Sequence, residues 1–332
     1  MKTKALTLMS IVASFWIIHS AVAQDEVFVA QDGVNTGTIG AYDVSFGANS
    51  ASGSTVSSSL ITTPSAGAST EVRTSLTTDG LGDLFVGEWA SGTTATIGEY
   101  SLSGTPINSS LLTLSDSKGV PQIAADSEGQ LFVGLGQILY KYTTGGTLLN
   151  SIQVGPFGYS APITAMAMDN QGDVYMVSST GDPLQGNPYR SLVQEYTASG
   201  SLETLFSTPA YINSLAIGGG DIFASIQDGP PDIVNQVNEY TTGGSLVTSG
   251  LIPGIGGHLA LDGQGHLLVD SYGDGTVSAY TTSGILLQSD VISGAGGAED
   301  IVAIPVPEPS VAGLFAAGAL GLFIRIGSRR RP

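Results

Sequence analysis

Few residues of this sequence could carry out acid–base chemistry, and the best placed of them lie in its last quarter. After residue 23 the chain contains two histidines, His258 and His266, and the acidic pair Glu299 and Asp300 follows them. A histidine together with carboxylates is a common general acid–base set. If the protein is an enzyme, we expect His258, Glu299 and Asp300 to form its catalytic site.

Other catalytic and metal-binding chemistries have less support. The chain has no cysteine, which excludes disulfides, thiolate nucleophiles and cysteine-ligated metals. It also lacks a nucleophile elbow, a phosphate-binding loop and a paired-histidine zinc motif. Calcium is an alternative at two aspartate-containing turns, where Asp79 could act with Asp83, or Asp169 with Asp173. One or two carboxylates per turn fall short of the oxygens that Ca²⁺ prefers, so we predict no metal and no cofactor.

These turns belong to a repeated unit of the sequence. An Asp-x-x-Gly turn stands between two apolar stretches four times, and a Gly-Gly-Gly turn replaces it once; the turns are 79–82, 126–129, 169–172, 218–220 and 262–265. Aspartate at the first position accepts backbone N–H groups, and glycine supplies the positive φ at the end. The flanking stretches are short and alternate in polarity, as in 130–134, which predicts β-strands.

Each unit has a third strand that ends in a tyrosine, and the six tyrosines are Tyr42, Tyr100, Tyr142, Tyr196, Tyr240 and Tyr280. A glycine-rich hairpin and a fourth strand follow most of them. Four strands in about 40 to 55 residues predict one blade of a β-propeller. We expect the tyrosines to pack between blades rather than to take part in chemistry.

The two ends of the repeat region complement each other. Residues 27–29 have the pattern of a second strand, and the first strand missing from that unit is supplied by 300–304. We predict that these segments share one sheet, which gives six blades and leaves the ring without open edges. The units resemble those of NHL-type, SMP-30-like and streptogramin-lyase-like propellers. The resemblance implies an all-β, six-bladed β-propeller over residues 24–304.

In such a ring the first strands line a central channel. Aligning them on their turns places seven polar residues at its mouth: Thr74, Ser75, Gln122, Thr164, Asn213, His258 and Asp300. A lactonase resembling the SMP-30 enzymes would need several carboxylates and an asparagine around one metal ion. A lyase resembling the streptogramin enzymes would need a histidine base, and His258 is the candidate for that role.

The connections between second and third strands should lie on the same rim as the channel mouth, and they vary in length up to the long segment 178–191. Variable loops on a rigid scaffold commonly carry recognition residues, and exposed aromatic residues often dominate binding. The predicted ligand-binding residues, taken from this rim and the channel mouth, are Trp89, Gln122, Tyr189, Arg190, Asn213 and Asp232.

The first 23 residues have the pattern of a secretory signal peptide. Lys2 and Lys4 precede an apolar run over 5–18, and small residues at 21–23 precede Gln24. We expect signal peptidase to remove residues 1–23.

The last residues, 305–332, form a second targeting segment. Pro307, Glu308 and Pro309 precede an apolar run over 311–324, and the chain ends in the cluster Arg329, Arg330 and Arg331. The run is short for a stable membrane helix, and the arginines should stay cytoplasmic. This order resembles the PEP-CTERM sorting signal of Gram-negative bacteria. The resemblance implies a transmembrane sorting helix that anchors the chain transiently in the inner membrane, cleavage by an exosortase, and delivery to the cell surface or extracellular matrix.

The region between these ends is strongly acidic. Residues 24–306 contain four cations and 27 carboxylates, a net charge of about −23, which disfavours nucleic acid and anionic lipid as partners. Our first hypothesis is therefore a secreted, non-enzymatic propeller that binds extracellular polysaccharide or another envelope component. The alternative is a metal-dependent lactonase- or lyase-like enzyme with its site at the channel mouth.

Overall fold

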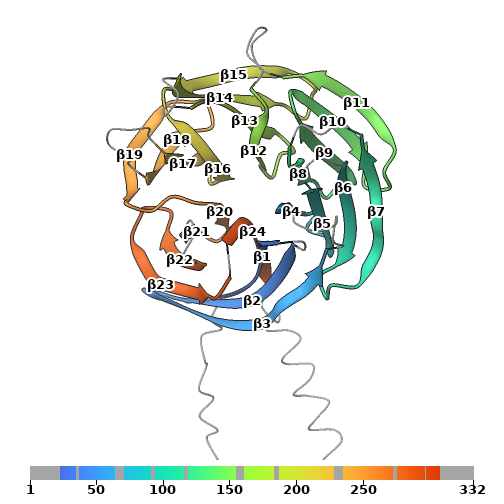
Figure 1. Cartoon of the computed structure of the whole chain (residues 1–332). Helices are drawn as coiled ribbons and strands as arrows, with labels where there is room; N and C mark the ends of the chain where they lie inside the picture. The colour runs from blue at the N-terminus through green and yellow to red at the C-terminus, as the bar shows by residue number, and fades with distance from the viewer. Residues whose placement is uncertain are drawn as a thin grey trace, which may run out of the picture. The chain divides into compact units, whose positions relative to one another are not determined.

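The computed structural model describes residues 23–34, 37–63, 71–90, 94–115, 119–154, 161–182, 187–227, 235–271, 275–295 and 297–306. Within these ranges the chain forms 24 β-strands, arranged as a ring of six antiparallel blades of four strands each (Figure 1). A short pairing of residues 33–34 with 71–72 joins two of these blades into one eight-stranded sheet. The predicted all-β, six-bladed propeller is confirmed. The described part contains no helix long and apolar enough to cross a membrane. Of the predicted targeting segments, 1–23 and 305–332, residues 1–22 and 307–332 lie outside the described residues.

Five blades are each built from four consecutive strands. Blade 1 contains β4 (Glu71–Thr78), β5 (Asp83–Ala90), β6 (Ala95–Ser101) and β7 (Pro106–Leu114). Blade 2 contains β8 (Gln122–Ala125), β9 (Gln130–Leu135), β10 (Ile138–Thr143) and β11 (Leu148–Gln153). Blade 3 contains β12 (Ile163–Met168), β13 (Val174–Asp182), β14 (Asn187–Tyr196) and β15 (Leu202–Thr208). Blade 4 contains β16 (Tyr211–Gly218), β17 (Asp221–Gln227), β18 (Asn235–Thr241) and β19 (Leu246–Pro253), and blade 5 contains β20 (Leu259–Leu261), β21 (His266–Ser271), β22 (Thr276–Thr281) and β23 (Leu286–Ser293).

The sixth blade joins the two ends of the propeller. Its innermost strand is β24 (Gly297–Val306), which pairs with β1 (Ala23–Val34); β2 (Thr38–Gly47) and β3 (Ser50–Thr62) complete the sheet. Val27 lies opposite Ala303, and the ladder runs as far as Gln24 opposite Val306. This is the predicted ring closure, and the strand continues two residues beyond the predicted boundary at 304. We call this sheet the closing blade.

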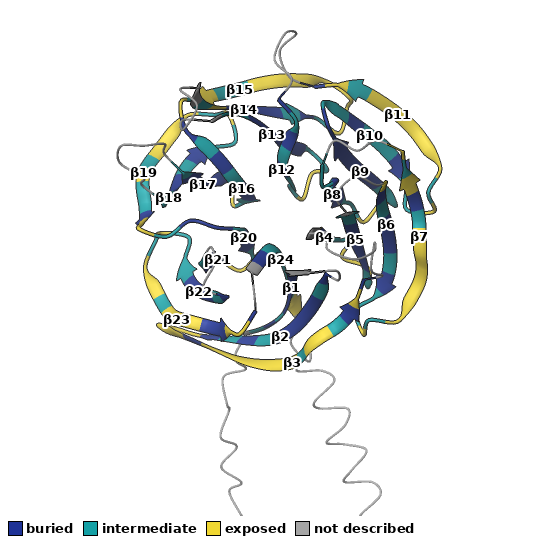
Figure 2. Ribbon diagram, in the orientation of Figure 1, coloured by how far each residue is buried: buried dark blue, intermediate teal, exposed yellow. Residues whose placement is uncertain are grey.

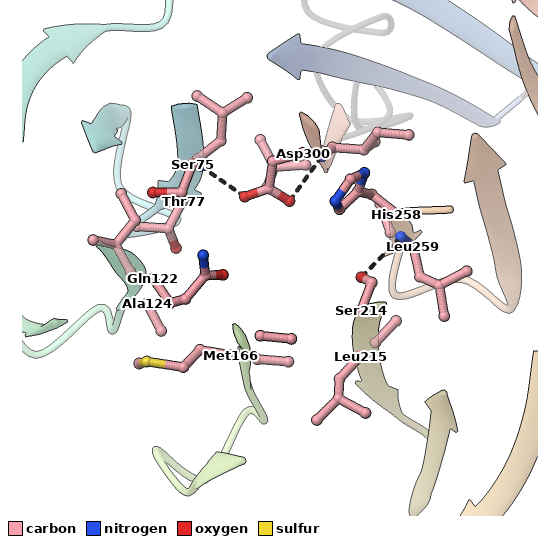
Figure 3. Close-up of a pocket in the computed structure, with 18 of the residues that line it drawn as sticks. Ser75, Thr77, Gln122, Ala124, Met166, Ser214, Leu215, His258, Leu259 and Asp300 are labelled. Carbon is pink, nitrogen blue, oxygen red and sulfur yellow. Dashed lines mark hydrogen bonds between the residues drawn. The ribbon is translucent and has the colours of Figure 1, made fainter. Parts of the chain in front are cut away.

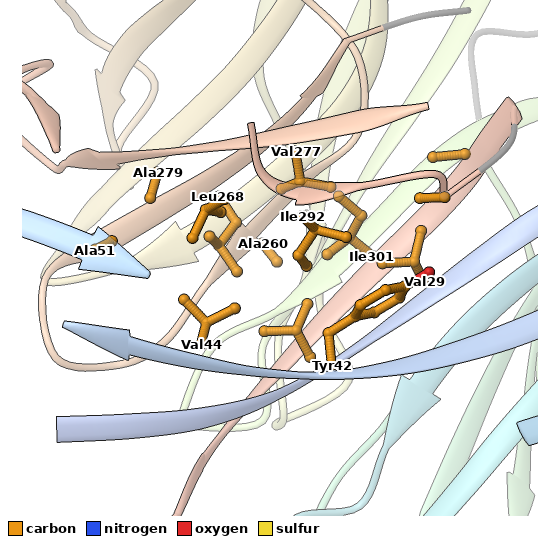
Figure 4. Packing of buried hydrophobic residues seen from close by; sticks show 14 of the residues in the cluster. Val29, Tyr42, Val44, Ala51, Ala260, Leu268, Val277, Ala279, Ile292 and Ile301 are labelled. Carbon is orange, nitrogen blue, oxygen red and sulfur yellow. The ribbon is translucent and has the colours of Figure 1, made fainter. Parts of the chain in front are cut away.

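The core consists of six clusters, each shared by two neighbouring blades. Tyr42, which is 2% exposed, packs with Val44 of the closing blade and with Leu268 and Val277 of blade 5 (Figure 4). The other five blade tyrosines occupy equivalent clusters, so the prediction that they pack between blades is confirmed. The inner strands are largely buried, and the fourth strands form an exposed outer layer (Figure 2).

The glycine-rich hairpins between third and fourth strands bring neighbouring blades into close contact. Gly244 has a φ of +84°, and a Cβ there would lie 2.8 Å from the carbonyl oxygen of Leu205 on blade 3. Gly284 repeats this arrangement against Leu251 on blade 4, with a φ of +80°. Glycine is therefore required both by the backbone conformation and by the approach of the next blade.

The Asp-x-x-Gly turns use their carboxylates as backbone acceptors. One oxygen of Asp126 accepts the N–H groups of Glu128 at 3.0 Å and Gln130 at 2.8 Å. The carboxylates of Asp79, Asp169 and Asp262 accept equivalent pairs of bonds. Among the described residues no group of three or more His, Cys, Asp or Glu side chains is arranged to hold a metal ion. The turns thus have a structural explanation that needs no calcium.

One prediction concerning the loops is wrong. The segment 178–191 was expected to be a long connection, but β13 continues to Asp182 and β14 begins at Asn187. Thr180 lies opposite Arg190 in this extension. The two strands satisfy each other's backbone groups, so a polar sequence that resembles a loop can continue the ladder. The residues near Glu88 are likewise part of a strand, because β5 extends to Ala90.

A buried pair of carboxyl groups lies where blade 5 meets the closing blade. Asp25 on β1 is 0% exposed, and neither of its oxygens has a hydrogen-bond donor. Asp262 is 1% exposed and is held by the backbone of its turn and by Nδ1 of His266. The His266 ring stacks on Phe46 of β2 with centroids 3.9 Å apart. Burial, and then the nearby charge of Asp262, raise the pKa of Asp25 to about 7.

The Asp25 carboxyl should make the propeller less stable as the pH rises. Its pKa is higher in the folded chain than in the unfolded one. The contribution of Asp25 to the free energy of unfolding is therefore complete below about pH 4 and is lost as the pH rises through about 7. We expect Asp25→Asn to remove this dependence and to stabilise the protein at pH 8 by a few kcal/mol, since each pKa unit corresponds to about 1.4 kcal/mol.

Urea unfolding of wild type and variant at several pH values between 4 and 8 tests this expectation. The matched control is Asp221→Asn, the same change in a half-buried residue at the beginning of β17. A stability difference between Asp25→Asn and wild type that does not change with pH would contradict the assignment.

Candidate functional site

The six first strands, β4, β8, β12, β16, β20 and β24, line a central cavity of about 320 Å³ (Figure 3). All seven polar residues predicted at the channel mouth lie in its wall, as does Glu299. The alignment of strands on their turns therefore placed these residues correctly. We call the rim where the first strands begin the upper rim, and the rim that carries the Asp-x-x-Gly turns the lower rim.

His258 is fixed by a residue that the sequence analysis missed. Asp270 on β21 is 0% exposed; one carboxylate oxygen accepts the backbone N–H of His258, and the other lies 3.2 Å from Nδ1 of its ring. The backbone N–H of Asp270 donates to the carbonyl of His258 at 3.1 Å. A Cβ at Gly257 would overlap the Asp270 carboxylate. Glycine thus allows the loop to wrap around this carboxylate, which orients the imidazole.

The charge of His258 follows from its neighbours. Burial lowers the pKa of His258, but the hydrogen bond and charge of Asp270, with the charges of Asp300 and Glu299, outweigh this effect and raise the pKa to about 9. The imidazole is therefore protonated at neutral pH. A protonated histidine can orient or donate a proton, but it cannot act as a general base.

Asp300 has a structural role in the channel wall. Its Oδ2 accepts the backbone N–H of Leu76 on β4 at 2.8 Å, and its Oδ1 accepts that of Ile301 at 2.9 Å. Burial raises the pKa of Asp300 to about 6, although His258 and these two bonds act in the opposite direction. Asp300 therefore ties the closing blade to blade 1.

Equivalent bonds connect other first strands. Thr77 Oγ1 accepts the backbone N–H of Ala125 at 3.3 Å, and Ser214 Oγ accepts that of Leu259 at 3.1 Å (Figure 3). First strands of neighbouring blades face one another without forming a sheet, so side chains supply partners for their backbone groups. Polar residues in this channel thus serve the ring as well as any ligand.

A second group of predicted residues lies on the upper rim of blades 3 and 4. The ring centroids of Tyr189 and Tyr211 are 5.4 Å apart with an interplanar angle of 58°. Tyr211 also borders the channel. Arg190 is exposed and borders a groove of about 390 Å³, whose other lining residues are Ala161, Ser178, Thr180, Ser191, Leu192, Ser207, Thr208 and Pro209.

The predicted ligand-binding residues do not form one site. Gln122 and Asn213 line the channel, Arg190 lines the groove, and Tyr189 contacts Tyr211. Trp89 is on blade 1; its side chain is half-buried, and its Nε1 atom is buried without a hydrogen-bond partner. Asp232 lies outside the described residues.

Of the two residues that the sequence analysis missed, Asp270 and Tyr211, the first could have been found by closer comparison of the blades. Asp270 lies on the second strand of blade 5. The equivalent second-strand positions of blades 1 to 4 carry small or apolar residues, which are Gly87, Gly134, Val177 and Ser225. A charged residue at such a position is a signal. Tyr211 directly precedes the aligned part of its strand and gave no comparable signal.

The pairing of His258 with Asp270 makes a titration prediction. We expect Asp270→Asn to lower the pKa of His258 from about 9 to its ordinary value or below, because burial then acts without the compensating carboxylate. NMR titration of the imidazole signals measures this shift. Asp262→Asn is the matched control, since it changes the partner of His266 instead. A His258 titration that Asp270→Asn leaves unchanged would refute the pairing.

Comparison with known proteins supports the fold. No family model and no curated protein matches the chain. A solved protein of unknown function from Bacteroides caccae matches with a TM-score of 0.53 and 14% identity, covering 86% of this chain and 99% of that one. A gluconolactonase from Xanthomonas campestris matches with a TM-score of 0.50 and 16% identity, covering 70% and 82%.

A third solved structure, a catalytically inactive virginiamycin B lyase from Staphylococcus aureus with quinupristin, has a TM-score of 0.38 and 11% identity, covering 68% and 86%. At the identities of the first two matches the likeness shows a shared fold alone. The chain is thus a six-bladed β-propeller similar in fold both to an enzyme and to a protein whose function is unknown.

Proposed function

We propose that this protein is an exported, non-enzymatic recognition propeller that binds extracellular polysaccharide or another envelope component through its upper rim. The observation that carries the proposal is the pair Tyr189 and Tyr211 on the upper rim of blades 3 and 4. Arg190, the next residue of β14, lines a groove on the opposite face of blade 3. Tyrosine offers a large, rigid surface with a polar end, which suits the apolar faces and hydroxyl groups of sugar rings.

The groove has the size and chemistry for such a ligand. Its volume of about 390 Å³ lies in the usual range for small-molecule sites. Serine and threonine hydroxyls make up most of its polar wall, with Thr180, Ser207 and Thr208 at least partly exposed. Hydroxyl groups act both as donors and as acceptors, and they can therefore match the hydroxyls of a sugar.

The proposal includes export and sorting. Signal peptidase removes residues 1–23, and an exosortase-type protease removes the tail after about Pro307, which releases the protein to the cell surface or extracellular matrix. Gln24 pairs with Val306 in the closing blade, so cleavage just outside these two residues would leave the whole β1–β24 ladder intact. This arrangement supports processing at both ends.

A second candidate function is a lactonase- or lyase-like enzyme at the channel mouth. The observation that favours it is the orientation of His258 by the buried Asp270, since a carboxylate that fixes a histidine is common in catalytic sites. Two features disfavour it. His258 is protonated at neutral pH, and the carboxylate of Asp300 already accepts two backbone N–H groups.

The recognition proposal predicts that the aromatic residues matter more than the histidine. We expect Tyr189→Ala to weaken polysaccharide binding by about tenfold, because truncation of an aromatic anchor typically costs 1 kcal/mol or more, and Trp89→Ala to weaken it as well. His258→Ala should leave binding largely intact. Isothermal titration against a panel of extracellular polysaccharides makes the comparison.

The control for this series is Leu81→Ala on the lower rim, where Leu81 is 70% exposed.

We also expect no tightly bound stoichiometric metal and no lactone hydrolysis at enzymatic rates. Catalysis that His258→Ala abolishes, or a specific divalent metal at the channel mouth, would favour the enzyme instead.

The sorting proposal predicts the mass of the mature protein. Protein isolated from the producing cell should begin at Gln24 and should lack the residues after about Pro307. Intact-mass spectrometry measures both ends at once. Recovery of the cluster Arg329 to Arg331 on most molecules would mean that the tail is retained.

A further inference from the structure

We propose that the groove on blade 3 binds an acidic sugar residue and that Arg190 pairs with its carboxylate. The inference deepens the proposed recognition function and rests on it. It concerns the class of polysaccharide, and it depends on three features: an arginine that pairs with no described residue, a groove whose described wall has no carboxylate, and a strand under Arg190 that is held by hydrogen bonds.

Arg190 is unusual because this protein has so few cations. Residues 24–306 contain Arg73, Lys118, Lys141 and Arg190 against 27 carboxylates. Lys141 lies 5.2 Å from the centroid of the Phe132 ring, and Arg73 also has an interaction partner. Arg190 is exposed and makes no ion pair or hydrogen bond with any described residue. Its guanidinium group is therefore available to a ligand.

No described residue in the wall of the groove carries a carboxylate. Apart from Arg190, its described lining consists of serine, threonine and apolar residues. An acidic sugar therefore meets a cation in the groove, where the planar guanidinium can form two parallel hydrogen bonds to a carboxylate.

Hydrogen bonds hold β14, the strand that carries Arg190, in place. Ser191 Oγ donates to the carbonyl of Ala210 at 2.8 Å, accepts the backbone N–H of Ile212 at 3.0 Å, and lies 2.7 Å from Ser179 Oγ. These bonds lie on the face of blade 3 opposite to Arg190 and connect β14 to the beginning of β16. The backbone that carries Arg190 is therefore fixed, which reduces the entropy lost on binding.

Two polymers that differ only in charge test the inference. Polygalacturonate carries a carboxylate on each sugar, and its methyl-esterified form does not. We expect the wild-type protein to bind polygalacturonate about three- to fivefold more tightly than the ester at about 0.15 M salt. At that salt the repulsion from the net charge of about −23 is screened beyond about 8 Å, whereas an ion pair in contact is screened less. Arg190→Gln should abolish this preference and leave the affinity for the ester unchanged.

Lys141→Gln is the matched control. It changes the net charge by the same amount, but Lys141 lies on blade 2 and does not line the groove. Its preference for polygalacturonate should equal that of the wild type, and added salt should reduce the preference in both. Equal binding of the two polymers by the wild type, weakened by Tyr189→Ala, would overturn the acidic preference while supporting recognition. An equal loss of preference in Lys141→Gln would overturn the role of Arg190, and failure to bind any polysaccharide in the panel would overturn both proposals.

Discussion

The pairing of β24 with β1 is the constraint on which the rest of the structure depends. Eight or more residues of each strand form one antiparallel ladder, so residues near the two ends of the described chain share a sheet. Without this ladder the closing blade would lack its innermost strand, and the channel would lack the wall that carries Glu299 and Asp300. The bond from Leu76 to Asp300 then connects that wall to blade 1. Each upper-rim site is consequently positioned by contacts between residues far apart in the sequence.

The same constraint explains the buried acid pair. Asp25 lies in the ladder opposite Pro305, and its side chain lies beside the Asp262 turn of blade 5. A charged carboxyl group buried without a donor is costly, and the raised pKa of Asp25 lessens that cost by favouring its neutral form. Blades 5 and 6 therefore meet through a contact whose strength changes with pH, in addition to the apolar packing of Tyr42 and its neighbours.

Much of the fold could be predicted from the sequence because it repeats. The turns, the terminal tyrosines and the split blade each recur or complete a pattern, and the repeat converts six weak local signals into one strong one. The channel residues were located for the same reason, since aligned strands must place equivalent positions at equivalent heights. The repeat does not by itself predict the tertiary contacts that one blade makes and the other blades lack. Asp270 against His258, the extension of β13 and β14, and the contact of Tyr189 with Tyr211 all belong to this class.

The polar residues of this propeller also show why residue type alone is a poor guide to function. Asp300 and the turn aspartates could each have been read as catalytic or metal-binding groups, yet backbone N–H groups occupy their oxygens. Ser214 and Thr77 in the channel are occupied in the same way. A side chain whose hydrogen-bonding capacity the fold already uses has less left for a ligand, whereas the Arg190 guanidinium donates to no described residue. The number of polar groups is therefore a weaker indication of a binding site than the number of hydrogen-bonding groups that the fold leaves unused. By this criterion the groove on blade 3 is a better candidate than the channel.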